Sequence, residues 1–175
     1  AAAAAAAAAA VAVRAQLSQT QINQLLALHN EPRCQKGNQP LQWDTGVARI
    51  AQAWADRCNK QHSTDRSLGE NLAWGSSGFS VQALAKQWVD EGRGCNFCCT
   101  GSLRVGHWTQ VIDRSSRKLG CGWASRCGYL VCNYQPAYQR SCGPALQNCP
   151  VVTWNGQTNL VNGQGGGGGG GGGGG

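Results

Sequence analysis

Two imidazoles and two carboxylates are the side chains of this sequence best suited to chemistry. His62 and Glu70 lie in one polar stretch, and Glu91 and His107 flank a second one. Zinc accepts imidazole nitrogen and carboxylate oxygen and keeps an open position in catalytic sites, so these four side chains could converge on one metal ion. They could equally form a neutralising hydrogen-bonded cluster. The sequence leaves both interpretations open.

A hydrolytic centre would need more than these four residues. A protease requires an activated nucleophile with an oxyanion hole, or a metal-held water with a base. Ser63 directly follows His62, but neighbours in sequence rarely have catalytic geometry, and neither G-x-S-x-G nor H-E-x-x-H occurs. We therefore expect a cavity that can bind a divalent ion in preference to a working active site.

Three N-cap residues mark the helices that must position these side chains. They are Ser18, Asp44 and Ser80. The first forms a capping box with Gln21, and Pro32 lies near the end of its helix. The second opens the most regular apolar pattern of the chain, and the third precedes a helix that ends at the 92–94 break. A short helical segment is expected at 106–112, around His107.

Strands are predicted at 71–74, 118–125 and 128–134, the last because its apolar residues alternate. Helices, a strand, helices and strands in this order predict an α+β domain with helices packed on an antiparallel sheet. From Pro136 onward, many Pro, Gly, Asn and Gln residues predict an irregular extension.

The ten cysteines favour disulfides over zinc. Only 95–98 has the C-x-x-C form, no histidine pair has zinc-finger spacing, and the remaining cysteines are spread singly along the chain. Oxidised cysteines are typical of secreted proteins, so we expect an extracellular location.

Charge and hydropathy limit the partners. The net charge of +7 is scattered, without the basic stripe and interleaved aromatic residues of a nucleic-acid surface. No apolar run approaches the length of a membrane span. The sequence predicts no nucleic-acid partner and no transmembrane segment, and a basic surface with some affinity for acidic polysaccharide or anionic membrane.

Composition divides the chain into four parts. Residues 1–16 are a low-complexity or unassigned segment that starts with ten alanines, and 165–175 is a glycine tract, a linker or unassigned. Between them we predict one domain at 17–139 and a cysteine-containing extension at 140–164.

Several motifs in order resemble one known family, the cysteine-rich secretory/antigen 5/pathogenesis-related 1 (CAP) superfamily. Residues 106–111, GHWTQV, look like its GHYTQ signature, and 130–136, LVCNYQP, look like its CNYxP signature. His29, Asn30 and Arg33 match HNxxR, and 69–72, GENL, falls in family order. The resemblance runs from about Ser18 to Pro136.

The resemblance implies a disulfide-stapled, three-layer α-β-α sandwich with a small antiparallel sheet. It implies a central cavity lined by His62, Glu70, Glu91 and His107. It also implies three disulfides, Cys58–Cys127, Cys121–Cys132, and Cys95 with Cys98 or, preferred here, Cys99. The partners of Cys34, Cys142 and Cys149 stay open, since they lie outside what the resemblance covers.

Two positions depart from the family pattern. Asp113 stands where a Trp usually follows the first signature, and 137–139 replaces the Gly-Asn that usually follows the second. The domain can survive both changes, but a plant-type C-terminal signalling peptide cannot be carried over.

The function expected from the resemblance is a secreted, non-enzymatic defence-type or lipid- and sterol-binding module. It requires no cofactor, although the cavity could hold a divalent ion such as zinc. One alternative is a structural subunit of an extracellular matrix or fibre that self-assembles or pairs through intermolecular disulfides, with cell-wall or matrix components as partners. The other is a metal-dependent hydrolase. His29, Asn30 and Arg33 are expected to be structural, and the seven tryptophans mostly core.

Overall fold

The computed structural model describes residues 16–76, 78–92 and 106–138, together with the backbone of 148–152 and 158–162. The predictions for the alanine and glycine tracts, for the Cys95–Cys99 disulfide and for Cys142 lie outside these residues. Among the described residues, no helix is both long and apolar enough to cross a membrane.

The first helix, α1, spans Gln19–Gln35 and begins with the predicted capping box. Ser18 Oγ accepts a hydrogen bond from the Gln21 amide at 3.2 Å, and Gln21 Oε1 accepts one from the Ser18 amide at 2.9 Å. Pro32 lies near the end of the helix, as predicted, three residues before its last residue.

The other helices follow their predicted caps. Helix α2 spans Thr45–Ala55 behind Asp44, whose carboxylate accepts from the Val47 amide. Helix α3 spans Val81–Asp90 behind Ser80, and α4 spans Gly106–Val111. Each side-chain cap satisfies an amide that the first turn of a helix leaves without a partner.

A four-stranded sheet in the order β1-β3-β4-β2 forms the middle of the domain. Its strands are β1 (Gln42–Trp43), β2 (Gly69–Trp74), β3 (Lys118–Ala124) and β4 (Tyr129–Gln135). The β2–β4 and β3–β4 pairs are antiparallel, whereas β1 runs parallel to β3. Strand β1 was not predicted, because two residues are too few to show an alternating pattern.

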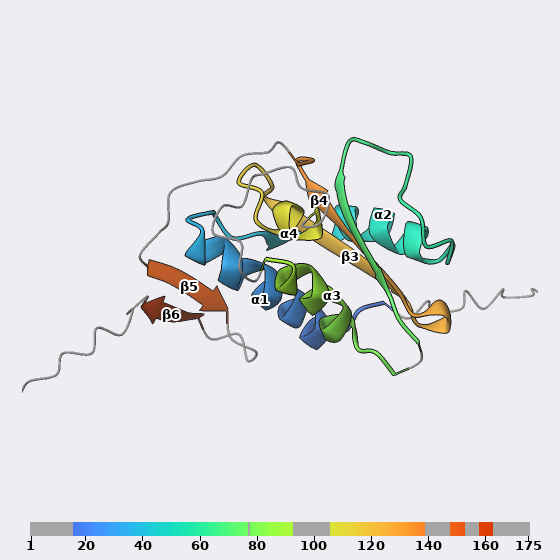
Figure 1. The fold of residues 1–175 in the computed structure, drawn as a ribbon, viewed down its shortest axis with the longest axis horizontal. Coiled ribbons are helices and arrows are strands. Elements are labelled where there is room, and N and C mark those ends of the chain that lie inside the picture. The colour runs from blue at the N-terminus through green and yellow to red at the C-terminus, as the bar shows by residue number, and fades with distance from the viewer. Residues whose placement is uncertain (1–15, 77, 93–105, 139–147, 153–157, 163–175) are drawn as a thin grey trace, which may run out of the picture.

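Helices cover both faces of this sheet and make a three-layer α-β-α sandwich (Figure 1). Strand β4 shows the division, since its side chains alternate between the faces. Leu130, Cys132 and Tyr134 pack with α1, α3 and α4, while Tyr129 and Val131 pack with α2. The fold expected from the resemblance is confirmed.

Two disulfides lie within the described residues, and they are pairs that the resemblance implied. Cys58–Cys127 joins the segment after α2 to the 3-10 helix η2 (Ser125–Cys127), across 69 positions of the sequence. Cys121–Cys132 links β3 to β4 at directly paired positions. Cys34 is also disulfide-bonded.

The predicted irregular extension contains a small two-stranded sheet. Strand β5 (Asn148–Val152) pairs antiparallel with β6 (Thr158–Asn162), and β5 lies against α1 (Figure 1). The prediction missed them because short apolar runs, 151–152 and 160–161, stand among many turn-forming residues.

Close packing of α2 on the sheet depends on two glycines of β3. A Cβ atom at Gly120 would overlap the backbone at Val47 and Ala48, and one at Gly122 would overlap the backbone at Ala51 and Gln52. The contacting atoms are main chain, so a rotamer change cannot relieve either overlap.

We predict that Gly122→Ala lowers the free energy of unfolding by about 3 kcal/mol, because α2 must move away from the sheet. Urea unfolding followed by circular dichroism measures this change. Gly106→Ala is the matched control, since a Cβ there meets nothing within 4 Å. Equal stability of the two variants would contradict the close approach of α2 to β3.

Candidate functional site

His62 and Glu70 form the first of two imidazole–carboxylate pairs. Glu70 lies on β2, and His62 belongs to the segment that leads from α2 to that strand. Glu70 Oε1 lies 2.8 Å from His62 Nδ1 and accepts from the Ser63 amide at 2.9 Å. The Glu70 side chain is only 7% exposed and the His62 side chain is 54% exposed, so a buried carboxylate orients an accessible ring.

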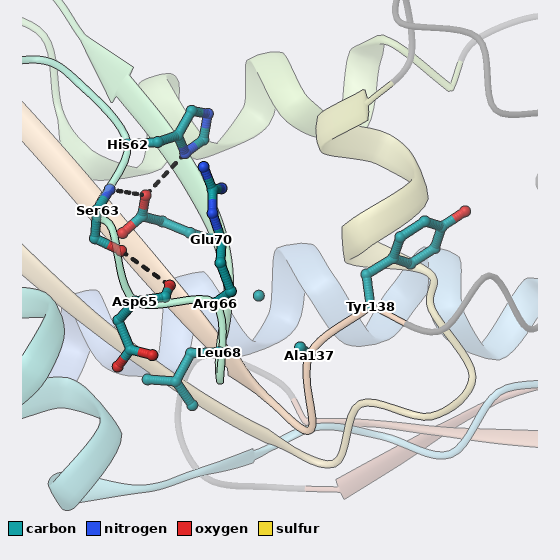
Figure 2. A pocket seen from close by; sticks show the side chains of 9 residues that line it. His62, Ser63, Asp65, Arg66, Leu68, Glu70, Ala137 and Tyr138 are labelled. Carbon is teal, nitrogen blue, oxygen red and sulfur yellow. Dashed lines mark hydrogen bonds and ion pairs between the residues drawn. The ribbon is translucent and has the colours of Figure 1, made fainter.

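This pair borders a recess of about 230 Å³, which we call the histidine recess (Figure 2). The 63–70 segment forms one wall, and Ala137 and Tyr138 lie on another side. Figure 2 shows the Arg66 side chain extending toward His62 and Glu70. The recess therefore combines a carboxylate, an imidazole and a guanidinium.

His107 and Glu91 form the second pair. Glu91 caps the end of α3, and its Oε1 lies 2.6 Å from His107 Nδ1. Its Oε2 accepts from the His107 amide at 3.1 Å and from the Trp108 amide at 3.2 Å. One carboxylate thus fixes both the imidazole and the first turn of α4.

The four predicted site residues are thus arranged as two pairs, and neither Glu91 nor His107 lines the histidine recess. In the part of the chain that is described, no three His, Cys, Asp or Glu side chains gather as a metal site would need. In both pairs Nδ1 faces a carboxylate, which leaves Nε2 as the nitrogen that could bind a metal ion or polar ligand. A single four-residue centre stays a prediction.

Ser63 does not form a nucleophile–base pair with its neighbour. Its Oγ donates to the Asp65 carbonyl oxygen at 3.4 Å, while the neighbouring imidazole bonds to Glu70. A serine hydrolase would require the base to hold the hydroxyl proton.

A buried hydrogen-bond chain supports the second pair from the core. His29 Nδ1 lies 2.6 Å from the Leu25 carbonyl oxygen and must donate to it, so Nε2 accepts from the Tyr134 hydroxyl at 2.7 Å. The Tyr134 oxygen in turn accepts from Asn71 Nδ2 at 3.1 Å. The second proton of that amide goes to the His107 carbonyl oxygen at 3.0 Å.

Burial sets the charge state of this chain. It lowers the pKa of His29 to about 4, so the ring is neutral at neutral pH, and it raises the pKa of Tyr134 well above its usual value. Asn71 and Tyr134 were not among the predicted site residues. One signal in the sequence could have identified them. Both are polar residues at strand positions whose neighbours on the same face of the sheet are apolar.

Asn30 and Arg33 connect the end of α1 to the loops around the site. Asn30 exchanges two hydrogen bonds with the backbone of Leu41. Arg33 is fully buried and donates to four carbonyl oxygens. Asp113, which departs from the family pattern, is buried and accepts from the amide and hydroxyl of Ser116.

The three layers, the cross-strand disulfide and the two His–Glu pairs define the class, a disulfide-bonded α-β-α sandwich with paired imidazoles and carboxylates. The model of the cysteine-rich secretory protein (CAP) family matches residues 26–134. The chain belongs to this family.

The chain is similar to several pathogenesis-related proteins of plants. Pathogenesis-related leaf protein 4 of Solanum lycopersicum is 41% identical over 122 residues, which cover 63% of this chain and 74% of that protein. Pathogenesis-related protein 1A of Nicotiana tabacum is 42% identical over 135 residues, which cover 70% and 77%.

Solved structures agree on the fold. A crystal structure of NaASP2 with Zn²⁺ has a TM-score of 0.57 and 28% identity, and the match covers 74% of this chain and 85% of that one. The structure of Na-ASP-1 reaches a TM-score of 0.62 at 21% identity, over 78% of this chain and 44% of that one.

We predict that His29 makes the domain less stable as the pH falls. The unfolded chain takes up a proton near the ordinary pKa of 6.5, while the native ring resists protonation until about 4. Stability from this group is therefore complete above pH 6.5, falls between pH 6.5 and 4, and levels off below, with a total loss of roughly 3 kcal/mol.

Urea unfolding at several pH values, compared with His29→Gln, isolates this contribution. The other two histidines are present in both proteins, so their contribution cancels in the difference. If the two proteins lose the same stability between pH 7 and pH 4, His29 is not held neutral by burial.

Proposed function

We propose that this protein is a secreted, non-enzymatic, defence-type binding module whose ligand is a lipid such as a sterol or a fatty acyl chain. An apolar groove of about 400 Å³ carries the proposal. It lies between the start of α1, strand β1 and one flank of α2, and we call it the α1–α2 groove. Its volume lies within the range typical of small-molecule sites.

Apolar side chains from three elements supply the walls of the α1–α2 groove. They include Leu17 and Ile22 near the start of α1, Trp43 of β1, and Ala48 and Ala53 of α2. Arg49 borders the same space, and its guanidinium could donate hydrogen bonds to a polar head group. Each Å² of apolar surface that is removed from water stabilises a complex by about 25 cal/mol. The hydrocarbon of an acyl chain or a sterol therefore suits these walls.

Two further observations support a secreted binding role. The disulfides favour an oxidising compartment, as does membership of a family described as cysteine-rich secretory proteins. Several relatives are named pathogenesis-related proteins, which supports a defence-type role. Ser63 Oγ donates to the Asp65 carbonyl oxygen, and His62 Nδ1 bonds to Glu70. Because the hydroxyl and the imidazole have different partners, these contacts support binding over hydrolysis.

We predict that the purified protein binds a fluorescent fatty acid and that Ala48→Glu weakens this binding at least tenfold, because the new carboxylate is placed against the acyl chain. Fluorescence titration measures both affinities.

Ala83→Glu on the exposed side of α3 adds the same charge away from the groove and should bind like the wild type. If the wild type binds neither a fatty acid nor a sterol, the lipid proposal is wrong.

As a second candidate function we propose divalent-ion binding at the paired histidines. Its specific support is that each Nδ1 is held by a carboxylate, a contact that orients an imidazole and raises its basicity toward a metal at Nε2. Bound zinc would supply Lewis-acid character there. The residues available here would bind and orient the ion, with Glu70 and Glu91 holding the rings.

We predict that zinc titrated into the apoprotein binds with an affinity that His107→Ala lowers at least tenfold. Calorimetry gives the affinity, and a parallel peptidase assay tests for turnover. Zinc-dependent turnover lost in His107→Ala would replace this proposal with a hydrolase. Unchanged zinc affinity in both His107→Ala and His62→Ala would exclude the paired histidines as ligands.

A further inference from the structure

A second groove lies on the other side of α2, between this helix and the 63–70 segment. Its volume is about 360 Å³, and we call it the α2–β2 groove because that segment leads into β2. Ala53 borders both grooves, so α2 separates this one from the α1–α2 groove. Ser63, Asp65, Leu68 and Glu70 border it on one side and the histidine recess on the other.

Apolar side chains give the α2–β2 groove room for a hydrophobic body. Ile50 of α2 is 49% exposed, one of few large apolar side chains that the described residues expose to this extent. Trp54, one turn further along α2, and Leu68 complete the apolar wall. A ligand that covers exposed apolar surface of this kind is bound more tightly, because the surface is removed from water.

Asn133 contributes a buried hydrogen-bond acceptor for which the described residues supply no donor. The residue lies on β4 and is 2% exposed. Its Nδ2 donates to the Gly69 carbonyl oxygen at 3.2 Å and lies 3.5 Å from Glu70 Oε2, which fixes the orientation of the amide, because a flipped amide would bring oxygen against oxygen. The remaining atom, Oδ1, is buried without a partner among the described residues.

Glu70 adds a second acceptor to the same groove. Its Oε1 already accepts from His62 and from the Ser63 amide. Among the described residues, its Oε2 makes only the 3.5 Å contact with Asn133, which is too long for a strong hydrogen bond. A buried carboxylate oxygen with spare capacity favours a charged donor, because charge-assisted bonds are the stronger ones.

Arg57 and Asp65 are the other charged residues that border the groove, and the Arg66 side chain extends toward Glu70 from the histidine recess. The Arg57 guanidinium lies 4.6 Å above the Trp54 ring in a cation–π contact. Asp65 Oδ1 accepts from the Ser67 amide within its own loop, and its negative charge offsets that of Arg57. The acceptors Glu70 Oε2 and Asn133 Oδ1 therefore decide which head group suits the groove.

We propose that the α2–β2 groove binds a primary amine with an apolar body, its ammonium donating to Glu70 Oε2 and Asn133 Oδ1 and its hydrocarbon lying against Ile50, Trp54 and Leu68. A carboxylate head group would meet two acceptors and be repelled. An alcohol can donate only one proton and carries no charge. This site is separate from the α1–α2 groove, so it does not depend on lipid binding there.

Calorimetric titration with three eight-carbon probes tests the proposal on the full chain. We expect n-octylammonium to bind at least tenfold more tightly than n-octanol, and n-octanoate to bind most weakly. Glu70→Gln keeps the shape of the side chain and removes its charge, so the preference for octylammonium over octanol should shrink toward onefold. Equal affinity for the three probes, or an unchanged preference in Glu70→Gln, would overturn the proposal.

A substitution at the protein surface tests where octylammonium binds without disturbing the core. Ile50→Arg puts a bulky cation at the exposed edge of the groove and should weaken octylammonium binding at least tenfold. Ala83→Arg adds the same side chain at an exposed position of α3 and should leave binding unchanged. Equal losses in both variants, or in neither, would show that octylammonium binds elsewhere. If Ile50→Arg still binds the fatty acid, the two ligands occupy different grooves.

Discussion

The buried guanidinium of Arg33 is the interaction on which the arrangement of this domain depends. It donates to the carbonyl oxygens of Gln39, Val111, Asp113 and Ser116, at 2.8 to 2.9 Å. Burial lowers its pKa to about 10, so the group is still charged at neutral pH. A buried charge without partners costs several kcal/mol, which means that the end of α1, the end of α4 and the approach to β3 must stay assembled around it.

Helix α1 therefore supports the paired histidines although it contributes neither of them. Arg33 holds the far end of α4, and the chain from His29 through Tyr134 and Asn71 reaches the backbone of His107 at its start. Each member of this chain has a fixed donor or acceptor role, because burial keeps His29 neutral. A satisfied polar network of this kind specifies one packing of helix against sheet, since any other packing would leave polar groups without partners.

Helix α2 packs one face on the sheet and borders a groove on each flank. Its inner side lies directly on the backbone of β3, where glycines 120 and 122 leave no side chain between helix and sheet. This close approach leaves its flanks accessible, and each flank borders one of the two grooves. The segment after α2 is tied down by Cys58–Cys127 before it reaches His62. The same helix thus positions both grooves and one histidine pair.

The sequence by itself determined what is local or periodic. Ser18, Asp44 and Ser80 act on amides three residues away, so their helices could be predicted, and the alternation in β4 gave the two faces of the sheet. Ordered motifs indicated the family and its fold. Only the tertiary structure decided which imidazole meets which carboxylate, and that Tyr134 bonds His29 across 105 positions. It also decided that the buried oxygen of Asn133 has no donor among the described residues. These contacts depend on sheet register and helix packing, which join residues far apart in sequence and leave no spacing by which to recognise them.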